Sequence, residues 1–185
     1  PYPRWVKTGI PLTTKSISDI CFEANLDLHS KSIKNTIAPE ILIAGCGTGQ
    51  HSIVAASHFS NCQITAVDLS LASIAYAKRK STELGITNLK YLQADILNLD
   101  QLQKKFDIIE SVGVLHHMDD PMLGWEILTK LLRPGGLMKI GLYSELGRQH
   151  ILKIRNEIKS MKIGTSKIEI TDFRQHLAES NKEHH

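Results

Sequence analysis

Residues 40–49 read EILIAGCGTG, an apolar run followed at once by a loop with glycine at positions 45, 47 and 49. A short, continuous apolar run is typical of a strand buried inside a parallel sheet. Glycines allow a sharp turn and let a ligand approach the bare backbone, and residues 49–59 fit a helix. We therefore expect a strand, a ligand-binding loop and a helix, in that order.

The same alternation of strand and helix continues as far as residue 143. Further strands are expected at 63–67, 89–93, 106–111 and 137–143, with helices at 70–84 and 119–132. Strands that alternate with helices form βαβ units, and their right-handed crossovers give a parallel sheet with helices on both faces. The predicted fold class is α/β: a doubly wound, mainly parallel, Rossmann-like sheet in a three-layer α/β/α arrangement, with strand order 3-2-1-4-5.

The alternating segment, residues 39–144, is predicted to be the core domain, and the two flanking stretches have a different character. Residues 1–38 are expected to be an N-terminal extension with one helix, over 16–28, where apolar residues recur at helical spacing. Residues 145–185 are expected to be a truncated helical extension. It would contain a long helix to about residue 162, a short strand or extended link at 168–170, and a polar helix over 172–185. The start at Pro1, without a methionine, suggests a piece of a longer protein.

The composition excludes several classes of protein. Hydrophobic residues make up 42% of the chain and charged residues 22%, ordinary values for a globular domain, and the net charge of +3 does not indicate a nucleic-acid partner. No run of 18 apolar residues suggests a membrane span. The three cysteines are odd in number and lack C-x-x-C spacing, so we expect no disulfide framework, no metal site and a reducing, cytoplasmic location.

Two acidic residues follow neighbouring predicted strands, Asp68 after the second and Asp95 after the third. In the expected strand order, the carboxyl ends of these strands share one rim of the sheet with the glycine loop. An acceptor-only carboxylate at position 68 can take both hydroxyls of a ribose, and Asp95 can accept a hydrogen bond from an adenine amino group. Each of the two can instead cap a following helix. The G-x-G-x-G spacing differs from the G-x-G-x-x-G of dinucleotide folds, which disfavours an NAD-dependent oxidoreductase.

Five stretches, taken together and in order, resemble the class I S-adenosylmethionine-dependent methyltransferases. They are ILIAGCGTG (41–49), AVDLS (66–70), QADIL (93–97), FDIIESVGVLHHMDDP (106–121) and LLRPGGL (131–137). The resemblance implies S-adenosylmethionine as cofactor. It also implies a set of cofactor-binding residues: Gly45, Cys46, Gly47 and Gly49 along the methionine part, Asp68 at the ribose, Leu69, Asp95 and Ile96 at the adenine, and Ser111 and Val112 near the methionine end.

The opening PYPRW, with ILIAGCGTGQHS at 41–52, looks like a narrower group in which a methyltransferase module follows tetratricopeptide repeats in bacterial proteins. One position departs from the wider family, which usually has Asp or Glu two residues before the first glycine, where this chain has Ile43. The missing carboxylate normally helps to anchor the ammonium group of the cofactor, so either affinity is weaker or another group takes its place. No convincing pair of strands follows the fifth, where many members of this fold class add a hairpin.

The sulfonium of S-adenosylmethionine already activates its methyl group, so the enzyme mainly aligns the acceptor and excludes water. A general base is needed only where the acceptor must lose a proton, and His117, in the pair His116-His117, is the best candidate. We expect methyl transfer to a small-molecule or protein acceptor that the sequence does not identify. The alternative is a non-catalytic cofactor-binding or scaffold module of a larger repeat protein.

Overall fold

The computed structural model describes residues 9–11, 13–144 and 146–180. The chain forms two compact units that meet in the sequence between Leu142 and Tyr143. The first unit holds the sheet and the second is helical, and each is described by itself.

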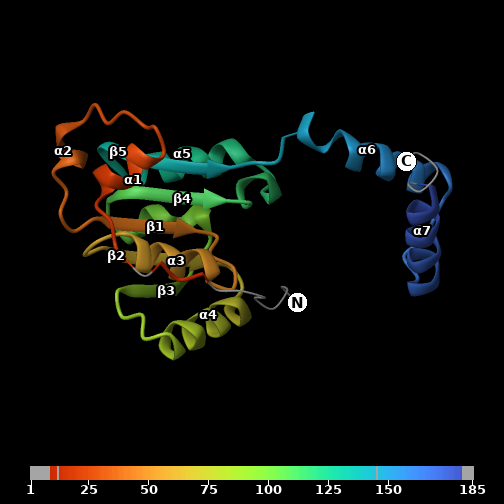
Figure 1. Ribbon diagram of the computed structural model, residues 1–185, viewed down its shortest axis with the longest axis horizontal. Coiled ribbons are helices and arrows are strands. Elements are labelled where there is room, and N and C mark those ends of the chain that lie inside the picture. The colour runs from red at the N-terminus through yellow and green to blue at the C-terminus, as the bar shows by residue number, and fades with distance from the viewer. Residues whose placement is uncertain (1–8, 12, 145, 181–185) are drawn as a thin grey trace. The chain divides into compact units, whose positions relative to one another are not determined.

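The first unit is built on a five-stranded sheet (Figure 1). All neighbouring strands are parallel and the order is β3-β2-β1-β4-β5, which confirms the predicted fold class and strand order. The strands are β1 (Glu40–Ala44), β2 (Gln63–Asp68), β3 (Leu89–Gln93), β4 (Phe106–Val112) and β5 (Leu132–Gly141).

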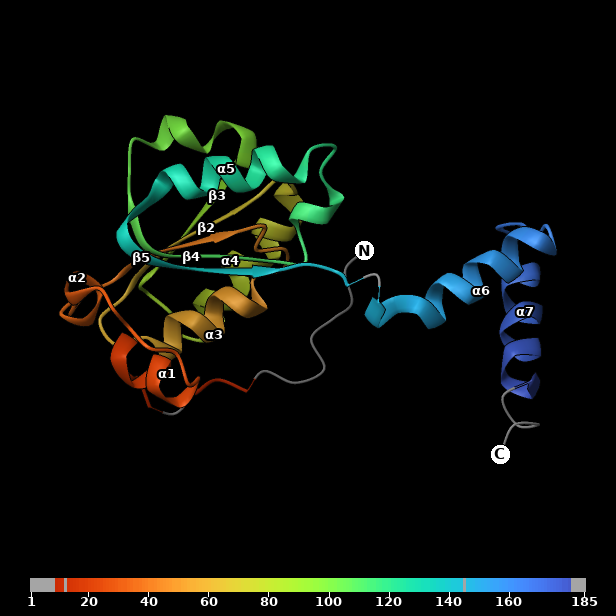
Figure 2. The same cartoon turned by 90° about the horizontal axis from the view of Figure 1, so that it is seen from above.

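Helices cover both faces of this sheet, as Figure 2 shows with the sheet seen edge-on. Helices α1, α3 and α4 lie on one face and α5 lies on the other, so the unit has three layers. The helical elements are α1 (Ile17–Glu23), α2 (Lys31–Lys34), α3 (Gln50–His58), α4 (Leu71–Glu83), α5 (Pro121–Leu131) and two short 3-10 helices, η1 (Ile96–Leu102) and η2 (Leu115–His117).

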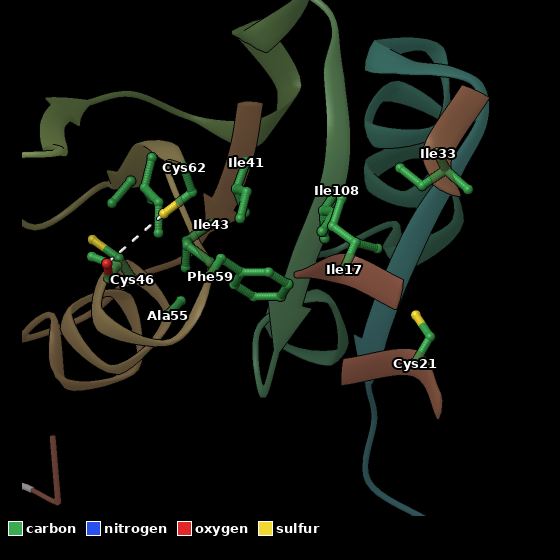
Figure 3. Packing of buried hydrophobic residues seen from close by; sticks show 13 residues of the cluster. Ile17, Cys21, Ile33, Ile41, Ile43, Cys46, Ala55, Phe59, Cys62 and Ile108 are labelled. Atoms are coloured by element: carbon green, nitrogen blue, oxygen red, sulfur yellow. Dashed lines mark hydrogen bonds between the residues drawn. The ribbon is translucent and has the colours of Figure 1, made fainter. Parts of the chain in front are cut away.

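Two hydrophobic cores hold the layers together because successive strand residues point to opposite faces of a sheet. Ile41, Ile43 and Ile108 pack with α1 and α3 in one core (Figure 3). Leu42 and Ile109, one residue along, pack with α5 and η1 in the other. Strands β1 and β4 are therefore packed on both faces, and the loop after β1 starts from this packed part of the sheet.

The N-terminal stretch differs from the prediction in containing two helices. Ser16 and Asp19 form a capping box that starts α1, with the Asp19 N–H donating to Ser16 Oγ at 3.1 Å and the Ser16 N–H donating to Asp19 Oδ2 at 3.3 Å. The helix ends at Glu23, ahead of Asn25 with its φ of 53°, and α2 follows. Ile17 and Ile33 are buried in the core of the first unit. This stretch is thus part of the same compact unit as the sheet.

Strand β5 begins five residues earlier than predicted, at Leu132, and ends at Gly141. Residues 133–136, between the predicted helix and the predicted strand, lie inside β5, where Leu132 pairs with Phe106 and the ladder is irregular before Ile108. Pro134 is tolerated there because β5 is an edge strand, whose outer side needs no ladder hydrogen bonds.

The second unit contains η3 (Leu146–Arg148), α6 (Gln149–Ser160) and α7 (Lys167–Ser180). The expectation of a strand or extended link at 168–170 is wrong, because these residues lie in the first turns of α7. Ser166 and Glu169 form a capping box: the Glu169 N–H donates to Ser166 Oγ at 3.2 Å, and the Ser166 N–H donates to Glu169 Oε2 at 3.1 Å. Within the described ranges, no strand follows β5, and no helix has the length and apolar character needed to cross a membrane.

Candidate functional site

The loop between β1 and α3 requires glycine at two of its positions. Gly45 and Gly49 have φ of 83° and 86°, in the left-handed region that disfavours residues with a Cβ. A Cβ at Gly45 would lie 2.7 Å from Val114 Cγ1 and closer still to Cγ2. A Cβ at Gly49 would lie 2.5 Å from the Cβ of Ala77. The loop is therefore packed against its neighbours through bare backbone.

The Asp68 carboxylate meets this loop at the rim of the sheet. The Gly47 N–H donates to Asp68 Oδ2 at 2.7 Å, and the Ser70 N–H donates to Oδ1 at 2.9 Å. The N–H groups of Gly45 and Cys46 both donate to the Val67 carbonyl at 2.9 Å. Each carboxylate oxygen can accept a second hydrogen bond, so Asp68 keeps the capacity to take two ligand hydroxyls.

A pocket opens at this rim, and six of the residues singled out from the sequence line it. It holds about 530 Å³ of empty space, open solvent included. Its wall is mostly apolar, with two carboxylates. The lining residues are Gly45, Val67, Asp68, Leu69, Ala94, Asp95, Ile96, Val114, His117 and Met118.

Asp95 caps a helix, one of the two roles considered from the sequence, and its place in the pocket wall leaves the other as a prediction. Its Oδ1 accepts a hydrogen bond from the Leu97 N–H at 3.0 Å and caps η1, and the residue also lines the pocket. Ile96 beside it is buried, whereas Leu69, which also lines the pocket, is exposed. The two apolar side chains offer a surface for a flat ring, with carboxylates at its edge.

His117 lies in the pocket wall, at the end of η2. The centroids of the His116 and His117 rings are 4.2 Å apart. His117 is thus near the rim where a ligand would bind, next to Met118. The PYPRW stretch at residues 1–5 lies outside the described residues.

Three of the predicted site residues do not present their side chains to this pocket. Cys46 is 7% exposed, and burial, with the charge of Asp68 adding to it, raises the pKa of its thiol to about 12. Ser111 is buried and its hydroxyl donates to the Ala44 carbonyl at 3.1 Å, which ties the end of β4 to β1. Val112 is half-exposed beside Gly141. Gly47 and Gly49 also lie outside the pocket lining and shape the loop behind it.

Sequence reasoning missed a contact between a buried glutamate and a histidine next to the loop. Glu110 on β4 has a side chain only 8% exposed, and its Oε2 contacts His51 Nε2 in the first turn of α3. Burial would raise the pKa of Glu110, but the hydrogen bond and charge of His51, with smaller effects of Lys139 and His58, lower it. A glutamate in the middle of the buried strand FDIIESV was the signal available in the sequence, since acids are rarely buried unless paired. Across the residues with described structure, no three His, Cys, Asp or Glu side chains form a group that could hold a metal ion.

Comparison with known proteins gives a consistent family. A family described as a methyltransferase domain matches residues 39–183 of the 185. An uncharacterized protein of Synechococcus sp. is 37% identical over 121 residues, which cover 65% of this chain and 29% of that protein. An (S)-coclaurine N-methyltransferase of Papaver somniferum is 31% identical over 115 residues, 62% of this chain and 32% of that protein.

Among solved structures, PKMT2 from Rickettsia typhi in complex with AdoHcy superposes with a TM-score of 0.66 at 27% identity, covering 78% of this chain and 29% of that one. The chain spans about a third or less of the length of each of these proteins.

Proposed function

Because the chain belongs to the methyltransferase domain family, we propose that it binds S-adenosylmethionine at the rim pocket and transfers its methyl group to an acceptor. The observation that carries the proposal is the contact between the Gly47 N–H and Asp68, which brings a bare backbone bend and a carboxylate to one edge of the pocket. Further support is that a structural relative was solved in complex with AdoHcy (S-adenosylhomocysteine), the product that such a transfer leaves.

The chemistry of the pocket fits an adenosyl ligand. Asp68 would accept the two ribose hydroxyls with the lone pairs that Gly47 and Ser70 leave open. Leu69 and Ile96 offer apolar surface to an adenine ring, and Asp95 would accept from its amino group. The backbone of Gly45, which lines the pocket, would lie along the methionine part.

S-adenosylmethionine would supply a methyl group that is bonded to a sulfonium. The acceptor can attack this methyl group without further activation, and the sulfur leaves as a neutral thioether. The residues of this chain then have three tasks, which are to hold the donor, to exclude water and to align the acceptor. His117, in the pocket wall, would take a proton from an acceptor that carries one, and is dispensable for an acceptor that does not.

Calorimetric titration with S-adenosylmethionine, S-adenosylhomocysteine and NAD tests the proposal. We expect the two adenosyl compounds to bind and NAD not to. Asp68→Ala should weaken the binding of both adenosyl compounds by about 1–3 kcal/mol, the cost of leaving polar groups unpaired. Asp27 is an exposed acid that does not line the pocket, so Asp27→Ala is the control and should leave both affinities unchanged. Binding of NAD alone would contradict the proposal, and unchanged affinity in Asp68→Ala would remove Asp68 from the site.

A second candidate is a cofactor-binding or scaffold module without turnover. Ile43, in place of the usual carboxylate, favours it, as does the helical stretch after β5 where the described residues contain no further strand. Transfer of a radiolabelled methyl group by a longer version of the protein would exclude this candidate.

For the whole protein we propose a cytoplasmic enzyme whose acceptor is a small molecule or a protein, with tetratricopeptide repeats beside the methyltransferase module. The free state of Cys21, Cys46 and Cys62 supports a reducing location. The repeats rest on the resemblance of residues 1–5 and 41–52 alone. A full-length sequence without them would contradict that part of the proposal.

A further inference from the structure

A glycine occupies the buried face of α5, where an apolar side chain is expected. The buried residues of this helix are Gly124, Leu128 and Leu131, which recur at helical spacing and so form one face. Glycine in a helix interior weakens the helix relative to alanine. The backbone at Gly124 does not require glycine either, since its φ is not positive. The reason for glycine at this position therefore lies in the space around it.

That space is filled by Met118, the residue that ends η2. A Cβ at position 124 would lie 2.6 Å from Met118 Sδ and 2.8 Å from Met118 Cε, so the end of the methionine side chain rests on bare helix backbone. The same Cβ would lie 3.2 Å from Leu115 Cδ2. Leu115 is fully buried, whereas Met118 is half-buried and has three rotatable side-chain bonds. Met118 is therefore the side chain that would yield to a Cβ.

Met118 also belongs to the wall of the rim pocket, next to His117, whereas Gly124 does not line the pocket. Leu115 lies in the hydrophobic core between α5 and the sheet, and the pocket in front of Met118 is open space. A Met118 side chain displaced from Gly124 therefore moves toward the pocket. The residue at position 124 thus acts on the pocket through Met118.

These contacts connect a position on α5 to the width of the ligand pocket. Resting on the proposed function, we propose that Gly124 is a positioning residue, which lets Met118 lie back against α5 and so leaves the rim pocket wide enough for the adenosyl ligand. Glycine at this position lowers the stability of α5 and widens the pocket. Replacing it should therefore change stability and ligand affinity in opposite directions.

Gly124→Ala tests the inference by two measurements on the same protein. The urea midpoint of unfolding without ligand, followed by circular dichroism, should stay at or above that of the wild type, because alanine favours the helix and Met118 yields. Calorimetry should show that S-adenosylhomocysteine binds about fivefold to a hundredfold more weakly. The ligand must either push Met118 back against the new Cβ, which overpacks that contact, or fit a narrower pocket.

Met118→Ala shows whether the effect passes through Met118. In a protein that already carries Met118→Ala, adding Gly124→Ala should change the affinity less than about threefold, because the side chain that would enter the pocket is gone. Thr129→Ala is the matched control. Thr129 is an exposed residue of the same helix that does not line the pocket, so its replacement raises helix propensity and should leave the affinity unchanged.

An unchanged affinity in a folded Gly124→Ala protein, or the same loss of affinity in the Met118→Ala background, would overturn the inference while the proposed function stands. A lower urea midpoint together with weaker binding would also overturn it, because that result indicates a general loosening of the fold. So would a Gly124→Ala protein that does not fold, because Met118 would then not yield. Failure of the wild type to bind S-adenosylhomocysteine would instead overturn the proposed function, and the inference with it.

Discussion

Gly45→Ala should destabilise the first unit through a contact that the structure identifies. The φ of 83° costs a residue with a Cβ about 1–2 kcal/mol. The new Cβ would also lie 2.7 Å from Val114 Cγ1, so the valine or the loop must move, at about 1–3 kcal/mol for overpacking. The expected loss of unfolding free energy is the sum of the two, about 2–5 kcal/mol.

Gly85 provides a control that separates the two contributions. Its φ is 69°, and a Cβ there would have nothing within 4 Å. Gly85→Ala should therefore cost only the backbone part, about 1–2 kcal/mol. The difference between the two variants measures the collision with Val114.

Urea unfolding followed by circular dichroism gives these free energies by linear extrapolation. Adding Val114→Ala to Gly45→Ala should recover most of the difference, which a double-mutant cycle reports as a coupling of about 1–3 kcal/mol. If Gly45→Ala is no less stable than Gly85→Ala, or if Val114→Ala shows no coupling, the loop is not packed as described.

Two further predictions follow from the pKa directions. The pKa of Glu110 is lowered below the ordinary value of 4.5, so its ionised form stabilises the fold fully above that pH, and this contribution is lost as the pH falls through the lowered value. The unfolding free energy of the wild type should thus fall more steeply below pH 4.5 than that of Glu110→Gln, and equal slopes in urea titrations would refute the pair with His51. The pKa of the Cys46 thiol, raised to about 12, predicts that iodoacetamide at pH 8 modifies it far more slowly in the native than in the urea-unfolded protein. Equal rates by mass spectrometry would show that the thiol is not buried.

The strand–loop–helix unit at 40–59 and the acid at position 68 were predictable because their signals are local. An apolar run, alternating glycines and an acid at the next strand end each act over a few residues, and parallel strands bring their carboxyl ends to one rim. The start of α7 also had a local signal, the Ser166–Glu169 capping box, which outweighs the alternating pattern of Ile168 and Ile170.

Other features depend on partners distant in the sequence. Strand β5 starts at Leu132 because that residue pairs with Phe106 on the neighbouring strand, β4. The Ser111 hydroxyl is directed to the Ala44 carbonyl, 67 residues away, rather than to the pocket. His51 and Glu110 are 59 residues apart, and no pattern along the chain indicates that they meet.

By itself, the sequence determined the five strands of the sheet and their order, the bend at 45–49 and the residue types available at the rim, because periodicity and backbone freedom are properties of neighbouring residues. Only the tertiary structure decided which side chains face the pocket and which groups compensate the buried charge of Glu110. Those outcomes depend on strand register and on the packing of α3 against β4, which are set by contacts between segments far apart in the chain.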